Sequence, residues 1–241
     1  MSTTTPAVTH KQRILIEREE LILNVAKRIL RQNGYIYLTM DRIAIAAKCS
    51  KGTIYKHFAN KEDLIYSLYC NSVSNLIKVF ERAYTYHGNT REKFLTIGIS
   101  YLLYYQHHQM YEKHTLAFKN SVTGKNINKD KLKAMKSLEY KITKIPRYIV
   151  QSAIEAGDLD KKFQQNVNTI VFGFWAMHYG ALLQNQPDSS LHDFDSNPVV
   201  KMLWQNTNIF LDGYQWKPMS STTNSTTLFK KISTALLEGE I

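Results

Sequence analysis

The fold is decided by residues 38–64, which read LTMDRIAIAAKCSKGTIYKHFANKEDL. Thr39 is placed to cap a first short helix, because its hydroxyl can accept a hydrogen bond from a backbone N–H that the helix leaves unpaired. Ile43, Ala44 and Ala47 then recur at the three-to-four spacing of one buried helical face. The pattern predicts a short helix that begins beside Thr39 and buries one side.

A second short helix is expected after a tight turn formed by Lys48 and Cys49. Ser50 is its predicted N-cap, and Ile54 and Phe58 lie four residues apart on its inner face. The outward side is expected to carry hydrogen-bond donors and almost no apolar surface, from Lys51, Thr53, Lys56 and His57. Two short helices across such a turn are typical of a helix-turn-helix that reads DNA.

These residues closely resemble the DNA-binding domain of the tetracycline-repressor (TetR) family. The family pattern is roughly Ile-Ala-x-x-Ala-Gly-Val-Ser-x-Gly-Thr-Leu-Tyr-x-His-Phe-x-x-Lys-Glu-x-Leu. The chain matches it at Ile43, Ala44, Ala47, Ser50, Gly52, Thr53, Tyr55, His57, Phe58, Lys61, Glu62 and Leu64. Upstream, the family's first helix and its Gly-Tyr ending are matched by Ile22, Ala26, Ile29, Leu30, Gly34 and Tyr35. The resemblance covers about residues 16–70, and beyond them it is a similarity of helical layout only.

The chain departs from the family pattern in the turn. Lys48 stands where the family usually has Gly, and Cys49 where it usually has Val. A residue with a side chain costs roughly 1 kcal/mol in the left-handed conformation that glycine adopts freely. A slightly strained or reshaped turn is therefore expected, within an unchanged fold.

The resemblance implies a role for each polar side chain of the motif. Phosphates would be held by Thr39, Thr53, Tyr55 and Lys61. The positive end of the following helix dipole adds to the attraction of Lys61 for phosphate. Base edges in the major groove would be faced by Lys51, Gly52, Lys56 and His57. For Tyr55 the other explanation is packing beside Phe58, and partial packing is compatible with both.

Composition favours an all-α protein. The chain has 241 residues, of which 44% are hydrophobic, and it contains only 10 Gly and 5 Pro. Long runs of helix formers therefore meet few turn signals. The formal net charge is +11, and the first 85 residues carry 13 Lys/Arg against 7 Asp/Glu, or +6. A basic domain with a groove-entering helix is expected of a DNA-binding protein.

Four segments are expected along the chain. They are a mobile arm (residues 1–10), the three-helix DNA-binding domain with its helix-turn-helix (11–70), a larger helical effector-binding and dimerisation domain (71–213), and a flexible linker with a short amphipathic segment (214–241). Outside the motif, helices are predicted from residue 11 or 17 to 33 and over 60–83, 90–107, 110–122, 128–156, 160–184 and 198–211. Pro146 predicts a kink or break in its helix.

Residues 125–147 form a second basic stretch. They carry 8 Lys/Arg against Asp130 and Glu139, a local charge of +6. A solvated helix face explains the stretch, and an accessory contact with DNA or a partner is the alternative.

Several classes of function are not expected. The N-terminus lacks the apolar core of a signal peptide, and the longest apolar run, residues 170–177, is too short to span a bilayer, which predicts a soluble cytoplasmic protein with no membrane partner. His107, His108 and His114 lack the one-turn spacing of a helical chelate. Cys49 and Cys70 are expected to be buried thiols, so neither a metal nor a cofactor is predicted. No nucleophile elbow, phosphate loop or HExxH pattern indicates catalysis.

The second domain is rich in aromatic residues. The sequence predicts that a pocket for a small lipophilic or aromatic effector is lined by Tyr101, Tyr105, Tyr111, His114, Phe118, Phe172, Trp175 and Tyr179. A plain hydrophobic core is the other explanation for these residues. The resemblance favours the pocket, because such domains usually enclose a small-molecule site between these helices.

A stripe of small residues suggests how two copies would meet. Gly173, Ala176 and Gly180 lie at relative positions zero, three and seven, which would let another helix approach closely. Together with the helix near residues 199–210, the stripe suggests a four-helix homodimer interface of the kind that the resemblance implies. A contact between helices of one chain is the alternative.

The sequence thus predicts a homodimeric transcriptional regulator that a small lipophilic or aromatic ligand releases from a double-stranded DNA operator. By the resemblance, the ligand would favour a head separation that no longer matches half-sites one DNA turn, ~34 to 36 Å, apart. The alternative is a DNA-bound scaffold whose second domain recruits a protein partner and holds no effector. An enclosed apolar cavity would favour the regulator, and a filled core with an exposed apolar patch the scaffold.

Overall fold

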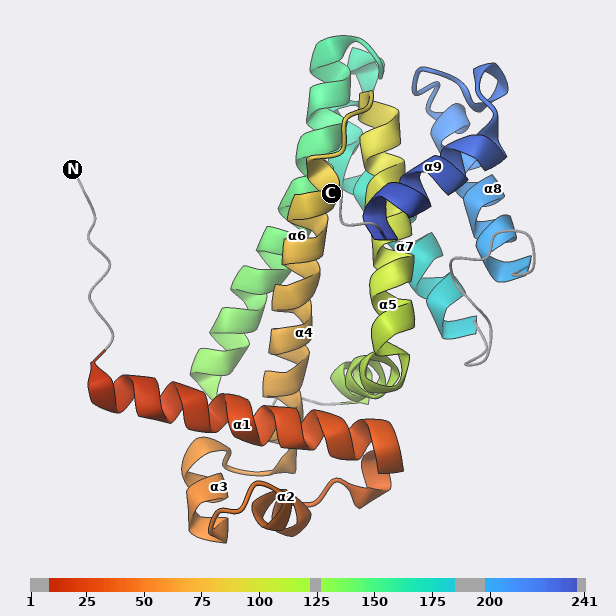
Figure 1. Ribbon diagram of the computed structural model, residues 1–241. Coiled ribbons are helices and arrows are strands. Elements are labelled where there is room, and N and C mark those ends of the chain that lie inside the picture. The colour runs from red at the N-terminus through yellow and green to blue at the C-terminus, as the bar shows by residue number, and fades with distance from the viewer. Residues whose placement is uncertain (1–8, 122–126, 185–197, 238–241) are drawn as a thin grey trace, which may run out of the picture. The chain divides into compact units, whose positions relative to one another are not determined.

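The structure is a computed structural model that describes residues 9–121, 127–184 and 198–237, with side chains for 9–105, 127–183 and 199–237. Every regular element in these ranges is helical, which confirms the predicted all-α fold (Figure 1). Within the described residues, no helix has both the length and the apolar character needed to cross a bilayer. Residues 1–8 of the predicted arm lie outside the description.

The chain divides into two compact units. The first comprises residues 1–71 and 110–134, and the second residues 72–109 and 135–241. The first contains the N-terminal elements α1 (His10–Asn33), η1 (Tyr35–Tyr37), α2 (Met40–Ala46) and α3 (Lys51–His57). The helices α4 (Lys61–Tyr84), α5 (Thr90–Ser121) and α6 (Lys129–Ala156) each contribute to both units. The second alone contains η2 (Lys161–Asn166), α7 (Val167–Gln184), α8 (Pro198–Gly213), η3 (Ser220–Thr222) and α9 (Ser225–Leu237).

The core of the first unit follows the predicted apolar pattern. Thr9 caps α1 in a capping box with Gln12, and Gly34 ends the helix with φ of 80°, a conformation that suits glycine. The buried stripe of α1 packs with the inner faces of α2, α3 and the start of α4. The fully buried residues of this core are Ile22, Ala26, Leu30, Leu38, Ile43, Ile54, Phe58, Leu64 and Leu68.

Three sequence predictions about where helices begin, end or break differ from the structure. Residues 90–121 form one helix, α5, rather than two, because residues 107–110 contain no Gly or Pro that would break it. Likewise, α6 continues through the buried Pro146 instead of breaking there. Asp160 caps the short 3-10 helix η2, so α7 begins only at Val167.

The segment predicted as a flexible linker is held in place. Trp216 is fully buried, the Lys217 N–H donates to the Asp158 carbonyl at 2.8 Å, and the Ser220 N–H donates to Asp212 Oδ1 at 3.0 Å. Then α9 packs its Phe229 against Trp204 at 5.2 Å between ring centroids. The polar composition of residues 217–227 misled the prediction, because these contacts come from residues distant in sequence.

The same region is anchored by the buried Arg91 at the start of α5. Its guanidinium lies 2.7 Å from Asp212 Oδ1 and donates to the Trp216 carbonyl at 2.7 Å and to Asn208 Oδ1 at 3.0 Å. Burial lowers the pKa of Arg91, and the charge of Asp212 opposes the shift. One side chain thus joins the start of α5 to α8 and to the segment that follows it.

The burial of His178 of α7 predicts that acid destabilises the second unit. It is buried, its Nδ1 lies 2.8 Å from the Phe174 carbonyl oxygen, and burial lowers its pKa from 6.5 to about 4. Between pH 6.5 and about pH 4, the unfolded chain therefore binds a proton at His178 that the folded chain does not bind. We expect the free energy of unfolding to fall by up to about 3 kcal/mol between pH 6.5 and pH 4 from this group.

The measurement is urea unfolding of the wild-type protein and of His178→Gln at several pH values from 7 to 4. The variant lacks the titrating group, so its free energy of unfolding should depend less steeply on pH over this window. Parallel pH profiles for the two proteins would contradict the expectation.

Candidate functional site

The helix-turn-helix is built by two N-caps at the predicted positions. Thr39 Oγ1 accepts a hydrogen bond from the Arg42 N–H at 3.2 Å at the start of α2. Ser50 Oγ accepts one from the Thr53 N–H at 3.1 Å at the start of α3. Both caps satisfy N–H groups that the short helices leave unpaired, and each therefore fixes where its helix begins.

The turn between these helices has the strain that the sequence predicted. Lys48 has φ of 51°, in the left-handed region that favours glycine. The following Cys49 N–H donates to the Ala44 carbonyl at 3.0 Å and closes the turn. Cys49 and Cys70 form no disulfide, and both are half-buried rather than buried as predicted.

The outer face of α3 presents Lys51, Gly52, Tyr55 and Lys56 to solvent. A Cβ atom at Gly52 would meet nothing closer than Ser50 Oγ at 3.7 Å, so this part of the backbone is open to an approaching ligand. The Tyr55 side chain is 51% exposed, which favours an outward role over packing beside Phe58.

Lys51 is already paired in the structure. Its Nζ lies 2.6 Å from Asp41 Oδ2 of α2, and both side chains are more than half exposed. An exposed pair of this kind is worth only about 0–1 kcal/mol, so a phosphate or a base edge can compete for the lysine.

His57 does not point outward, so that prediction was wrong. Its side chain is only 8% exposed, and its Nδ1 lies 3.8 Å from Glu19 Oε2 of α1. His57 follows the buried Ile54 by three residues, and this helical spacing turns it toward the inner face. In this conformation the imidazole faces the protein rather than the surface that α3 presents.

The two remaining predicted contacts are engaged within the domain. Thr53 Oγ1 lies 2.9 Å from Ser50 Oγ. Lys61, at the start of α4, donates to the Tyr35 carbonyl at 3.0 Å, and its Nζ lies 3.6 Å from the centroid of the Tyr35 ring. Burial lowers the pKa of Lys61, partly offset by the charge of Glu62. Lys61 therefore ties η1 to α4 and places its charge beside the helix-turn-helix.

A buried ion pair supports the end of α3, and the sequence analysis missed it. The Asp63 side chain is almost fully buried, and its Oδ2 lies 2.8 Å from Lys131 Nζ. The same oxygen accepts a hydrogen bond from the Ala59 N–H at 3.2 Å, and Lys131 Nζ lies 4.6 Å from the Phe58 ring centroid. Asp63 and Lys131 are 68 residues apart, so local periodicity carries no signal of their pairing.

Among the predicted effector residues whose side chains the structure describes, Tyr101 and the pair Phe172 and Trp175 do not line one cavity. Tyr101 is buried and packs edge-on against Phe80, with ring centroids 6.3 Å apart. In contrast, Phe172 is 66% exposed and Trp175 is 48% exposed, so neither of these two side chains lines an interior pocket shared with Tyr101. Tyr105 is also buried. The side chains of Tyr111, His114 and Phe118 lie outside the described residues.

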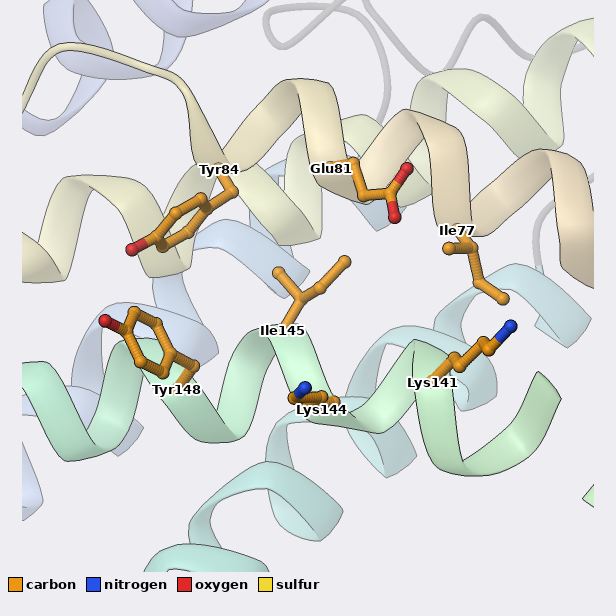
Figure 2. Close-up of a pocket in the computed structure, with 7 residues that line it drawn as sticks. All are labelled: Ile77, Glu81, Tyr84, Lys141, Lys144, Ile145 and Tyr148. Atoms are coloured by element: carbon orange, nitrogen blue, oxygen red, sulfur yellow. The ribbon is translucent and has the colours of Figure 1, made fainter. Parts of the chain in front are cut away.

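A different pocket lies between α4 and α6 in the second unit. It has a volume of about 400 Å³ and is lined by Ile77, Glu81, Tyr84, Lys141, Lys144, Ile145 and Tyr148 (Figure 2). None of these residues was predicted to line a pocket. The basic stretch over residues 125–147 was a partial signal, because it includes both lysines.

The small-residue stripe divides between two environments. A Cβ atom at Gly173 would lie 3.0 Å from Cε2 of Phe210 on α8, so Gly173 serves a contact within the chain. A Cβ atom at Gly180 would meet nothing within 4 Å. Around the stripe, α7 and α8 expose large apolar side chains, from Phe172, Trp175, Leu183, Met202 and Ile209. We call these five residues the α7–α8 apolar face.

Comparison with known proteins agrees with the geometry of the first unit. The family model for bacterial regulatory proteins of the tetR family matches residues 22–68. The uncharacterized HTH-type transcriptional regulator YhgD of Bacillus subtilis is 33% identical over 86 residues, which are 34% of this chain and 45% of that protein. The chain matches less than half the length of this relative and of the next, a Mycobacterium bovis regulator aligned over 38% of its length.

Solved structures share the fold over most of the chain. A TetR/AcrR-family regulator from Thermobifida fusca has a TM-score of 0.61 at 18% identity, covering 82% of this chain and 98% of its own. The SmeT–triclosan complex has a TM-score of 0.59 at 14% identity, covering 84% and 94%. Residues 22–68 thus form a helix-turn-helix domain that matches the tetR family of bacterial regulatory proteins.

Proposed function

We propose that the protein acts in the cytoplasm as a homodimeric transcriptional regulator that binds a double-stranded DNA operator through α3. The observation that carries the proposal is the outer face of α3, where Lys51, Gly52, Tyr55 and Lys56 are exposed beside a helix-turn-helix fixed by two N-caps. Regulators of this family are not enzymes, and we propose no catalytic activity for the chain.

The exposed residues divide by the chemistry they offer to DNA. Lys51 and Lys56 carry ammonium groups that can donate to base edges, and the bare backbone at Gly52 allows close approach to the major groove. The Tyr55 hydroxyl and the exposed Thr39 suit phosphate contacts that position the helix. Lys61 adds positive charge at the start of α4, where the helix dipole also attracts phosphate. His57 is left out of base recognition.

The proposal is tested by sequence selection with purified protein and random duplex DNA, followed by affinity measurements on the selected site. Lys56→Ala should weaken specific binding by about 1–3 kcal/mol and relax the preference at one base position if Lys56 contacts a base. If Lys56 contacts a phosphate, the affinity for every DNA sequence should fall equally, and the slope of log affinity against log salt concentration should decrease in magnitude by about 1.

Lys161→Ala is the matched control, because Lys161 is an exposed lysine of η2 and its removal changes the net charge equally. Its operator affinity should stay close to that of the wild type. Equal affinities for the wild type and Lys56→Ala on every sequence would remove α3 from the contact with DNA.

The homodimer rests on the α7–α8 apolar face. Phe172, Trp175 and Leu183 lie on one side of α7, at spacings of three and eight residues, and Met202 and Ile209 lie seven residues apart on α8. Large apolar side chains gathered on the surface commonly mark an interface. Two helices per chain would form the self-complementary contact of a two-fold dimer, with Gly180 open to the partner's side chains.

We also propose that the regulator is a repressor released by a small-molecule effector. The SmeT–triclosan complex shows a small aromatic molecule bound to a protein of similar fold. Because linkage is reciprocal, operator DNA must weaken effector binding by the same factor that the effector weakens operator binding. Titration of any effector with and without operator tests this equality.

The α7–α8 apolar face also favours a second candidate, a DNA-bound scaffold that recruits a different protein. In that case the face would be covered by the partner rather than by a second copy. Native mass spectrometry of the purified chain separates the two, because a homodimer mass supports the regulator and a monomer that retains operator binding supports the scaffold.

A further inference from the structure

The pocket between α4 and α6 has an apolar floor. Ile145 points from α6 toward α4, between Tyr84 at one end and Ile77 at the other (Figure 2). Tyr84 and Tyr148 close the first end with their rings edge to face, 5.8 Å apart at 70°. The floor therefore offers two isoleucines and two aromatic rings, which suit a flat apolar body.

The rim of the pocket is mainly positive. Lys141 and Lys144 of α6 line it, and Lys93 Nζ lies 5.1 Å from the centroid of the Tyr84 ring. Glu81 is the one carboxylate among the lining residues. Two lysines and one carboxylate line the pocket, and Lys93 adds a third positive charge beside the Tyr84 ring, so the pocket favours an anion over a cation.

The tyrosine end adds hydrogen-bonding capacity without charge. Burial raises the pKa of Tyr84, and the neighbouring Tyr148 raises it further. The Tyr84 hydroxyl therefore stays protonated at neutral pH, and Tyr148 is its hydrogen-bond partner at this end of the pocket.

We propose that this pocket binds a small amphipathic organic anion. Its aromatic or otherwise flat apolar body would lie between Ile77 and Ile145, and its carboxylate, sulfonate or phosphate group would pair with Lys141 and Lys144. The volume of about 400 Å³ falls within the range of roughly 300–1,000 Å³ of small-molecule pockets. Binding of the anion does not depend on the proposed function, and only the use of this pocket as the effector site rests on it.

The test compares two fluorescent probes that differ only in charge. 8-Anilinonaphthalene-1-sulfonate carries a sulfonate on the ring system that N-phenyl-1-naphthylamine presents without charge. Each is titrated into the full-length protein without DNA. In the double variant Lys141→Gln/Lys144→Gln, the affinity for the sulfonate probe should fall by about tenfold, while the affinity for the neutral probe should change by less than about twofold.

Matched controls place the effect in the pocket. Lys133→Gln/Lys136→Gln removes two exposed lysines of the same helix outside the pocket lining and should leave both probes unchanged. Tyr148→Ala removes a half-exposed ring from the end of the pocket and should lower the affinity for both probes. Trp175→Ala, on the α7–α8 apolar face, should weaken neither.

Unchanged affinity of the sulfonate probe in Lys141→Gln/Lys144→Gln would overturn the proposal, as would an equal loss in the control pair of lysines. Loss of the probe in Trp175→Ala alone would place it on the α7–α8 apolar face and would also overturn the proposal. Operator affinity is measured separately on the same variants, so failure of DNA binding and failure of the pocket are distinguishable.

Discussion

Replacing Trp175 with glutamate is expected to separate the proposed homodimer into monomers and to weaken operator binding in parallel. Trp175 is 48% exposed and its ring stacks on Tyr179, with centroids 4.9 Å apart. In a two-fold interface the substitution occurs twice, and truncating a central tryptophan typically costs about 2 kcal/mol or more each time. The dimer dissociation constant should therefore rise by about a thousandfold.

The measurement is light scattering coupled to size exclusion over a range of protein concentrations, with operator affinity measured on the same samples. Tyr140→Glu is the control, because Tyr140 is an exposed aromatic residue of α6 away from the α7–α8 apolar face. It should remain dimeric. A Trp175→Glu protein that is still dimeric at nanomolar concentration would place the interface elsewhere.

The two glycines of α7 give a second test of the same interface. Gly180→Leu adds a side chain where the protomer leaves open space, so its folding free energy should change little while association weakens. Gly173→Ala instead crowds Phe210 within the chain and should affect the packing of α8 on α7. Dimerisation that responds to Gly173 and not to Gly180 would mean that the stripe serves only the internal contact.

The sequence predicted well what depends on neighbouring residues. The caps by Thr39 and Ser50, the buried face with Ile54 and Phe58, and the left-handed Lys48 all follow from spacing and backbone preference within one or two turns. The turn departs from the family pattern at Lys48, and the structure accommodates the lysine at the predicted conformation.

What the sequence could not predict depends on which helices meet. The position of His57 three residues after Ile54 was a local signal for the inner face that the sequence analysis did not use, whereas the approach of Glu19 from α1 has no local signal. Aromatic density likewise cannot distinguish a buried Tyr101 from an exposed Trp175, because both lie on apolar helices. The pocket joins Tyr84 to Tyr148, 64 positions later in the chain, and no local pattern connects them.

Electrostatics in the second unit shows the same limit. Burial raises the pKa of Asp212, but hydrogen bonds from Ser220 and the charge of Arg91 lower it by more, so the net pKa is below its usual value. A depressed carboxyl pKa stabilises the fold above the unfolded-state pKa, and that stability is lost as the pH falls through the folded-state pKa. The ion pair between Arg91 and Asp212 forms only because α5 and α8 bring the two side chains together.

Arg91→Met is expected to lower the free energy of unfolding of the second unit by about 3–5 kcal/mol, since breaking a buried pair leaves polar groups without compensation. The Arg91 side chain is 4% exposed, and methionine would leave Asp212 without its positively charged partner and the Trp216 carbonyl without the Arg91 donor. Urea unfolding followed by tryptophan fluorescence measures the loss.

Two variants separate the ion pair from the rest of the contact. Arg147→Met removes a partly buried arginine that contacts Thr143 and the Tyr140 ring, both on its own helix, and it should cost about 1 kcal/mol or less. Arg91→Met/Asp212→Asn removes both charges and should recover part of the loss, but not all of it, because the Trp216 carbonyl and Asn208 Oδ1 still lose their hydrogen bonds from Arg91. Full recovery in the double variant would mean that Arg91 acts only through its charge on Asp212. If the free energy of unfolding of Arg91→Met lies within about 1 kcal/mol of the wild-type value, this contact does not hold α5, α8 and the following segment together.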